Sequence, residues 1–289
     1  MEDKILDAAR QHAGQAEVYS QNETISTVRF QASRCHSIET KSITGVGLRV
    51  IHNGRVGFSS TTDPEQSKEL VKAAMETSAF GEPATFTLPS SQRLPLTRTF
   101  NNEVALEPVE TMVAIGDQIV TRCEELIPGL KADLTFRKSV AQIRLANSRG
   151  FDENYGKTVF SLDFEGLLII DSSLIWLHDF LNFSEHCAIN IEELIEGLAQ
   201  RAHHARRTAV LETKSYPCIF THQAAVDLLL TLLPAINGKN YQKGISPLIG
   251  KENEKLFDEK LTIWDDGLKE VESLLDETEM LARKLGKIR

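Results

Sequence analysis

The chain has 289 residues, of which 41% are hydrophobic and 25% charged, as in an ordinary soluble globular protein of one large or two modest domains. Its net charge is −9, and so acidic a surface repels phosphate groups, which argues against nucleic acid as a partner. The one dense basic segment, Arg201–Arg207, is typical of a last helical turn, where the helix dipole favours cations.

The cysteines and the apolar segments indicate the cellular compartment of the protein. Cys35, Cys123, Cys187 and Cys218 are far apart and form no Cys-x-x-Cys pair. The N-terminal segment lacks the basic and apolar regions of a signal peptide, and no run of about 18 apolar residues predicts a membrane span. These features predict a cytoplasmic protein with reduced thiols and no membrane partner.

The first half of the chain predicts helices mixed with hairpin strands. A helix over 2–13 ends at Gly14. Asn53-Gly54 indicates a hairpin turn, and Asp63-Pro64 predicts the start of a helix. A long connection and a helix from Pro108 to Ile127 follow. The predicted strands are 16–19, 25–32, 36–40, 45–51 and 56–61.

The second half continues the pattern, with strands at 139–146, 157–165 and 167–176 and a short one at Tyr216–Phe220. Helices are predicted from Asn190 to Ala202 and from His222 to Ala235. Because helices and hairpin strands mix without regular βαβ alternation, the fold class is α+β.

The C-terminal segment 268–288 carries apolar residues at helical spacing. It predicts an amphipathic helix that packs on this chain or on a partner.

Motifs that carry chemistry are mostly missing. The sequence has no phosphate loop, no Gly-x-Gly-x-x-Gly after a strand, no Gly-x-Ser-x-Gly elbow and no HExxH helix. Cys218 and His222, four residues apart, are the nearest approach to a zinc site, although two ligands do not complete one. The alternative is that Cys218 is a small buried apolar residue and His222 caps a helix.

Three further clusters contain residue types that ligate metals. His178 lies near Glu185, His186 and Cys187 in the sequence, and Asp265-Asp266 follow a predicted strand. Such acidic pairs more often cap helices or form turns, and His203-His204 point to different helix faces. The residues alone therefore indicate an α+β protein with no visible catalytic constellation.

Three stretches nevertheless resemble one family. The first combines Ser42–Val50 with Asn53–Thr61, and the second is the turn Leu145–Gly150. The third consists of Tyr216–Thr221, Gly244–Leu248, Gly250 and Leu261–Asp266. In this order, over residues 1–266, they resemble the TldD/PmbA (TldE) family.

The resemblance implies a cytosolic protein whose relatives form dimers of TldD with TldE. In such dimers the TldD subunit carries an HExxxH zinc motif and acts as a metalloprotease on unfolded peptides. Relatives are associated with maturing precursor peptides and degrading antitoxins, and "modulator of DNA gyrase" is an older label. Zinc would polarise the peptide carbonyl, and the motif Glu would act as the base.

The motif is degenerate in this chain. By resemblance, His222 matches the first ligand, Gln223 replaces the general base and Asp227 replaces the second His. Since Gln accepts no proton at neutral pH, the chain is predicted to be non-catalytic alone, to hold no cofactor and to resemble the TldE side. An Asp can still ligate zinc, and zinc is expected in a partner subunit.

The resemblance also implies the domain organisation. We expect an N-terminal α+β domain over 1–206, the start of a second α+β domain over 207–266, and the helical tail 267–289. Family members continue past Asp265-Asp266 into a large C-terminal domain, so the chain is expected to be C-terminally truncated.

Three functions follow from these observations. The first is a non-catalytic TldE-like component that pairs with a TldD-like subunit, or with itself, in processing unfolded peptides. The second is a peptide-binding scaffold without a protease partner, which accepts an added strand at a sheet edge. The third is a competent metallopeptidase with an atypical site near Cys218 and His222.

Overall fold

A computed structural model describes residues 2–63, 65–92, 94, 97–170, 173–183, 189–207, 209–261 and 263, without the side chains of Phe183, His222 and Gln223. The described chain divides into an N-terminal unit, up to Arg207, and a C-terminal unit, from residue 209 onward. Each unit is described by itself. The predicted tail helix over 268–288 lies outside the described residues.

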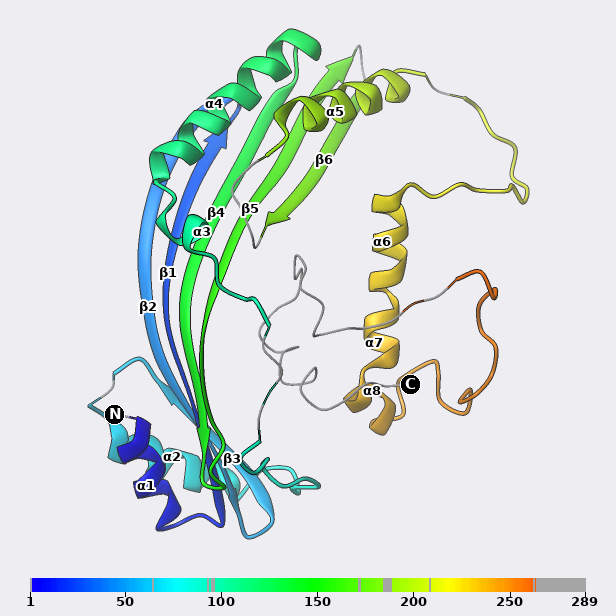
Figure 1. Cartoon of the computed structure of the whole chain (residues 1–289). Coiled ribbons are helices and arrows are strands. Elements are labelled where there is room, and N and C mark those ends of the chain that lie inside the picture. Colours follow the sequence, from blue (N-terminus) through cyan, green and yellow to red (C-terminus); the bar gives the residue numbers. More distant parts are fainter. Residues whose placement is uncertain are drawn as a thin grey trace. The chain divides into compact units, whose positions relative to one another are not determined.

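The N-terminal unit is built on a six-stranded antiparallel sheet of order β3-β2-β1-β4-β5-β6 (Figure 1). Its strands are β1 (Gln15–Gln31), β2 (Arg34–His52), β3 (Arg55–Thr61), β4 (Lys131–Asn147), β5 (Asp152–Ile170) and β6 (Ser173–Phe183). Its helices are α1 (Glu2–Arg10), α2 (Ser67–Ser78), α3 (Asn102–Leu106), α4 (Val109–Leu126) and α5 (Ile191–Ala205). The mixture of helices with an antiparallel sheet confirms the α+β class.

Several predicted strands are longer than the sequence indicated. The segments predicted as four strands over 16–51 form only two, β1 and β2, with 17 and 19 residues. The polar stretch Ser20–Thr24 has no apolar alternation, but β1 pairs with β2 and β4 on its two sides. Because both neighbours satisfy the backbone hydrogen bonds, the chain stays extended there.

The predicted break before Leu167 is wrong for a similar reason. β5 continues to Ile170, and Gly166 lies within the strand, where it pairs with Ala132 of β4 and with Leu177 of β6. The predicted strand 167–176 is therefore divided between β5 and β6, which pair antiparallel from Ile170 and Ser173 onward. Helix α2 likewise begins at Ser67 and not at Asp63, whose carboxylate accepts hydrogen bonds from the backbone N–H of Glu65 and the side chain of Gln66.

Two apolar cores hold the helices on one face of the sheet. Ala16 and Val18 of β1 belong to the core beneath α1 and α2, and Val28 and Phe30 belong to the core beneath α4 and α5. All four are even-numbered residues of one regular strand, so their side chains point to the same side. Figure 1 shows the two helix pairs at opposite ends of the curved sheet.

The C-terminal unit contains α6 (His222–Leu230), α7 (Leu232–Ile236) and α8 (Gly238–Gln242). The single helix predicted over 222–235 is divided at Thr231, since a proline ring at Pro234 conflicts with the carbonyl four residues before it. The strand predicted at Tyr216–Phe220 is irregular, because no neighbouring strand pairs with it in the described chain. No described helix is both long and apolar enough to span a membrane.

Candidate functional site

Helix α6 contains His222, Gln223 and Asp227, the residues that by resemblance stand at positions of HExxxH. Thr221 caps it, since its hydroxyl oxygen accepts a hydrogen bond from the backbone N–H of Ala224 at 3.4 Å. His222 and Gln223 therefore occupy the first turn, and Asp227 lies one turn later with an exposed side chain. The cap explains why the helix starts at this position and brings the first motif residue to its N-terminus.

The residue types of α6 limit its chemistry more than their spacing does. Positions 222 and 227 are five residues apart, the same separation as the two His residues of HExxxH, and they differ by roughly 140° around a regular helix. Gln223 stands at the position of the motif Glu and offers no base.

Cys218 precedes the helix in an irregular segment and is exposed, not a buried apolar residue as one interpretation held. Its Sγ lies 3.7 Å from the carbonyl oxygen of Tyr216. Within the described residues, no group of three or more His, Cys, Asp or Glu side chains is arranged to hold a metal ion. Among the described side chains, which do not include that of His222, no second and third ligand accompany Cys218.

The other candidate ligands are not brought together either. His178 on β6 has its Nε2 atom 3.3 Å from Oδ1 of Asp163, and both side chains are about half exposed. Its predicted companions Glu185, His186 and Cys187 lie outside the described residues, as do Asp265 and Asp266. The rings of His203 and His204 are 6.1 Å apart between centroids and tilted.

The basic segment at the end of α5 is partly neutralised. Arg201 donates a hydrogen bond from Nη2 to Oδ2 of Asp179 on β6, at 2.7 Å. This ion pair connects α5 to β6 and neutralises one of the positive charges of the Arg201–Arg207 segment.

One buried and one partly buried carboxylate, Glu17 and Glu23, lie on the sheet face opposite the helices, and sequence reasoning did not single them out. Glu17 is ion-paired with Arg49 of β2. Glu23 accepts a hydrogen bond from the hydroxyl of Ser139 at 2.5 Å and another from the side-chain amide of Gln21 at 3.0 Å. Because both carboxylates are engaged within the sheet, neither is placed as a free base.

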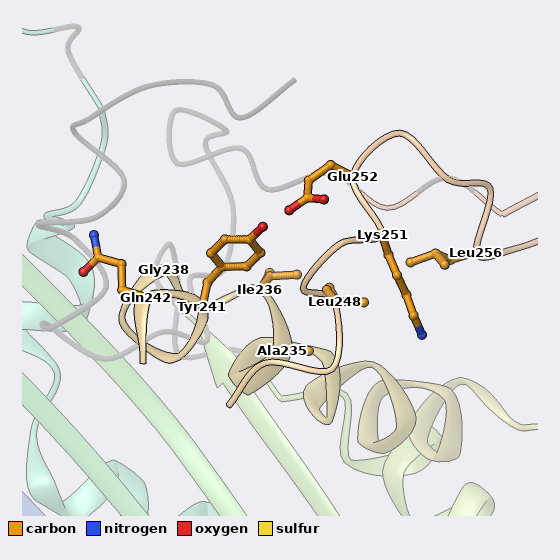
Figure 2. A pocket seen from close by; sticks show the side chains of 9 residues that line it. All are labelled: Ala235, Ile236, Gly238, Tyr241, Gln242, Leu248, Lys251, Glu252 and Leu256. Atoms are coloured by element: carbon orange, nitrogen blue, oxygen red, sulfur yellow. The ribbon is translucent and has the colours of Figure 1, made fainter. Parts of the chain in front are cut away.

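A shallow hollow of about 440 Å³ lies beside α7 and α8 in the C-terminal unit (Figure 2). It is lined by Ala235, Ile236, Gly238, Tyr241, Gln242, Leu248, Lys251, Glu252 and Leu256. The wall is mostly apolar, and Figure 2 shows Tyr241, Lys251 and Glu252 at separate points around it. Its described lining contains no pair of carboxylates and no nucleophile with an adjacent base, so these residues do not form a reaction site.

The segment Gly244–Leu248 has a structural role. The Ser246 hydroxyl donates to the carbonyl oxygen of Ala235 at 2.5 Å and accepts from the backbone N–H of Leu248 at 3.1 Å. Ser246 is buried, and Gly244 has a φ of +75°, a conformation that favours glycine. This serine therefore closes a turn and is not a nucleophile.

Comparisons with known proteins match both units. A model of the PmbA/TldA metallopeptidase domain 1 matches residues 16–78, and a model of the PmbA/TldA metallopeptidase C-terminal domain matches residues 213–278. The first match covers β1 to α2, and the second includes α6 with its degenerate motif. The order of the two regions is that of a metallopeptidase-related protein.

Solved structures share the fold. TldE from Thermococcus kodakarensis superposes with a TM-score of 0.81 at 18% identity, covering 95% of this chain and 64% of that one. A "modulator of DNA gyrase" protein from Bacteroides thetaiotaomicron superposes with a TM-score of 0.70 at 15% identity, covering 88% of this chain and 60% of that one. The corresponding protein from Thermotoga maritima superposes with a TM-score of 0.69 at 17% identity, covering 86% of this chain and 58% of that one.

An uncharacterized protein from Methanocaldococcus jannaschii is 24% identical over 269 residues, which is 92% of this chain and 61% of that protein. The chain thus spans about three fifths of the length of this relative. Both domain models and the fold agree in supporting an assignment of the chain to the TldD/PmbA family.

Proposed function

We propose that this chain is a TldE-like, non-catalytic component of a cytoplasmic zinc metallopeptidase system that processes or degrades unfolded peptides. The observation that carries the proposal is the composition of α6, where Gln223 and Asp227 stand in place of the base and the second ligand of HExxxH. A neutral amide does not take a proton from a zinc-bound water, so the reaction requires a catalytic partner subunit.

One further observation supports this role. The superposition on TldE covers 95% of the chain with a TM-score of 0.81, against 0.70 and 0.69 for the two modulator proteins. A chain of this kind would support the peptide cleft of a partner and would not itself bind the reacting peptide bond.

The test is metal content and peptidase activity of the chain alone and after co-expression with a TldD-like protein that carries HExxxH. We expect metal-free, inactive protein when it is purified alone, and a stable complex that holds zinc and cleaves a labelled unfolded protein such as reduced casein. Near-stoichiometric zinc in the isolated chain would contradict the proposal. His222→Ala, with His12→Ala as a matched control, would then show whether α6 holds the metal.

Failure to form a complex favours a peptide-binding scaffold without a protease partner. That alternative predicts that the isolated chain binds labelled casein without cleaving it. Cleavage by the isolated chain that depends on His222 or Cys218 would instead establish the atypical metallopeptidase.

A further inference from the structure

Strand β6 is an open edge of the sheet in the N-terminal unit. Its eleven residues, Ser173–Phe183, pair with β5 on one side. Among the strands that the structure describes, none pairs with its other side, and Figure 1 shows β6 as the last strand of the sheet. Such an edge presents a row of backbone donors and acceptors that another extended chain can use.

Next to β6, the chain covers the same edge of the sheet with its own backbone. β5 begins at Asp152, and its pairing with β6 starts only at Phe160. In the part before Phe160, the backbone N–H of Thr158 donates to the carbonyl oxygen of Thr99 at 2.9 Å, and the Thr99 hydroxyl donates to the carbonyl oxygen of Gly156 at 2.7 Å. The segment that precedes α3 therefore closes this part of the edge, whereas the structure describes no such cover on β6.

The same strand exposes large apolar side chains on one face. Leu174 is 61% exposed, Trp176 68% and Phe180 44%, whereas Ile175 is buried in the core beneath α4 and α5. The exposed residues are all even-numbered and so share the face opposite that core. Ile169 of β5, which pairs with Leu174, extends the apolar surface and is 62% exposed.

The usual protections of an edge strand are missing from β6. Its sequence, SLIWLHDFLNF, contains no Lys, Arg or Pro, and Asp179 is ion-paired with Arg201 of α5 at 2.7 Å. At the opposite edge of the sheet, the part of β2 that extends beyond β3 carries Arg34 and Lys41. Since native proteins block edges with such charges, the two edges differ, and only β6 is suited to receive another strand.

Two carboxylates lie beside the exposed apolar residues, on the same face. Glu165 of β5 pairs with His178, and Asp163 of β5 pairs with Phe180. Glu165 is exposed, and the side chain of Asp163 is 46% exposed, with its Oδ1 atom 3.3 Å from Nε2 of His178. The surface next to the middle of β6 is therefore negative, whereas Trp176 and Phe180 make it apolar on either side of this point.

The neighbouring strand β4 adds to this charge pattern. Asp133 pairs with Glu165 and so continues the negative row inward from His178. Lys131 and Arg137 are also on β4, one strand further from the edge than β5, and Arg137 is 3.5 Å from the carboxylate of Glu23. A cationic ligand at the middle of β6 is thus attracted by the nearer carboxylates, and an anionic ligand is repelled.

We propose that β6 binds an extended peptide as an added strand, with an apolar residue opposite Trp176, a Lys or Arg opposite His178 and an apolar residue opposite Phe180. These three peptide positions are two residues apart, so their side chains share the face that carries the exposed residues of β6. The added strand lies two strand spacings, about 10 Å, from β5, and a long cationic side chain reaches across His178 toward Glu165. Backbone pairing supplies affinity, and the alternate side chains supply selectivity.

Charge decides in favour of a peptide over a second copy of the chain. A second copy carries the same net charge of −9, and its β6 has no Lys or Arg to place opposite His178. The choice of a peptide as ligand rests on the proposed function, in which unfolded peptides are processed. The inference adds a binding site on the N-terminal unit, away from α6, and the sequence pattern that this site selects.

Fluorescence anisotropy of the isolated full chain tests the proposal with a labelled peptide, Thr-Leu-Thr-Lys-Thr-Leu-Thr. We expect a dissociation constant on the order of 10 µM, and a loss of roughly tenfold or more in Trp176→Ala, as for a central aromatic anchor. Ile43→Ala is the matched control, because Ile43 of β2 is 40% exposed on the same face of the sheet but belongs to the opposite edge. Circular dichroism melts establish that both variants fold.

The charge selectivity has its own test. Replacing the central Lys of the peptide with Glu should weaken binding by about fivefold at low salt, the effect of exposed charges, and added salt should reduce this difference. Glu165→Gln should also reduce the difference between the Lys and Glu peptides. Glu110→Gln, at an exposed carboxylate of α4, should leave it unchanged. Equal binding of the two peptides by the wild-type chain overturns the proposal.

Strand addition is tested by two N-methylated forms of the peptide. The N–H groups of successive residues in a strand point to opposite sides, so only one of the two alternate sets faces β6. Methylation of one set should weaken binding roughly tenfold more than methylation of the other. Equal binding of the two forms, or binding that Trp176→Ala leaves unchanged, overturns the proposal. Dimerisation through Trp176 in sedimentation velocity, without peptide binding, also overturns it, in favour of a second copy.

These outcomes are distinguishable from those for the proposed function. Peptide binding at β6 is measured with the isolated chain and needs neither zinc nor a catalytic partner. Failure to form an active complex contradicts the proposed function alone, and the absence of peptide binding that depends on Trp176 contradicts this inference alone.

Discussion

Arg144 on β4 forms a bidentate ion pair with Asp152 at the start of β5, with hydrogen bonds from Nε to Oδ1 at 2.9 Å and from Nη2 to Oδ2 at 2.8 Å. The same Nη2 atom donates to Oδ1 of Asp3 on α1 at 2.7 Å. One guanidinium thus joins the β4–β5 hairpin to the N-terminal helix. Bidentate pairs of this kind have more defined geometry than ordinary surface ion pairs.

Replacing Arg144 with Met should lower the free energy of unfolding by about 1 kcal/mol, the upper part of the range for partly exposed pairs. The carboxylates are 69% and 56% exposed for Asp3 and Asp152, so solvent screens most of the interaction. Urea unfolding followed by circular dichroism measures the loss. Arg29→Met is the control, because Arg29 makes a single exposed contact with Glu39 at 3.2 Å. Equal losses in the two variants would contradict the bridging role of Arg144.

The contribution of Arg144 should depend on pH. Its hydrogen bonds lower the pKa of Asp152 below the ordinary 3.8, and backbone hydrogen bonding lowers the pKa of Glu2, whose carboxylate is 3.8 Å from Arg144. A depressed pKa in the folded state gives stability that is present above the unfolded pKa and is lost as the pH falls through the folded pKa. The difference between wild type and Arg144→Met should therefore be constant from pH 7 to 5 and shrink below about pH 4. Urea titrations at stepped pH measure it, and a difference that grows on acidification would refute the assignment.

Two helical glycines should respond oppositely to alanine. Gly116 of α4 lies against the ring of the buried Phe30, so a Cβ there overlaps the ring, whereas nothing lies within 4 Å of a Cβ at Gly197 of α5. Gly116→Ala should destabilise by about 1–3 kcal/mol through overpacking. Gly197→Ala should stabilise by about 0.5–1 kcal/mol through helix propensity. Thermal melts of the two variants measure the change in melting temperature relative to wild type. Changes of the same sign in both variants would contradict the packing of α4 against Phe30.

Asn147 should be essential for the β4–β5 turn. It is 1% exposed, donates from Nδ2 to the carbonyl of Pro89 at 2.9 Å, and accepts at Oδ1 from the backbone N–H of Arg149 at 2.8 Å and of Phe151 at 3.3 Å. Asn147→Ala removes these three hydrogen bonds from a buried site and should cost about 1–3 kcal/mol. The neighbouring exposed Arg149→Ala should be nearly neutral. A neutral Asn147→Ala in urea unfolding would mean that water replaces the side chain.

The cysteines should differ in reactivity. Burial raises the pKa of the Cys123 thiol to about 12, while Cys35 and Cys218 are exposed. Because the thiolate is the reactive form, a maleimide at pH 7.5 should label Cys35 and Cys218 quickly and Cys123 only after unfolding in urea. Peptide mass spectrometry reads each site. Fast labelling of Cys123 in the native protein would show that the core beneath α4 opens.

In the stretches that resemble the family, several residues form turns or allow close backbone packing. Asn53 and Gly54 have positive φ angles of 49° and 72° in the β2–β3 turn, and Gly57 is closely approached by the Ala74 carbonyl of α2. Asn147 and Ser246 close turns in the two units. These residue types were visible in the sequence, but their hydrogen-bond partners lie up to 58 residues away and follow from tertiary contacts.

Local patterns in the sequence were enough to predict the helices over 2–13, 108–127 and 190–202, the Asn53-Gly54 hairpin, the α+β class and the missing HExxxH, because capping, periodicity and turn chemistry act over a few residues. Strand length was decided only by the tertiary structure, since the polar middle of β1 stays extended through pairing with strands on both sides. The same holds for burial. Ile175 and Trp176 are adjacent and equally apolar, yet one lies in the core and the other is exposed, because the core beneath α4 and α5 covers only one face of β6.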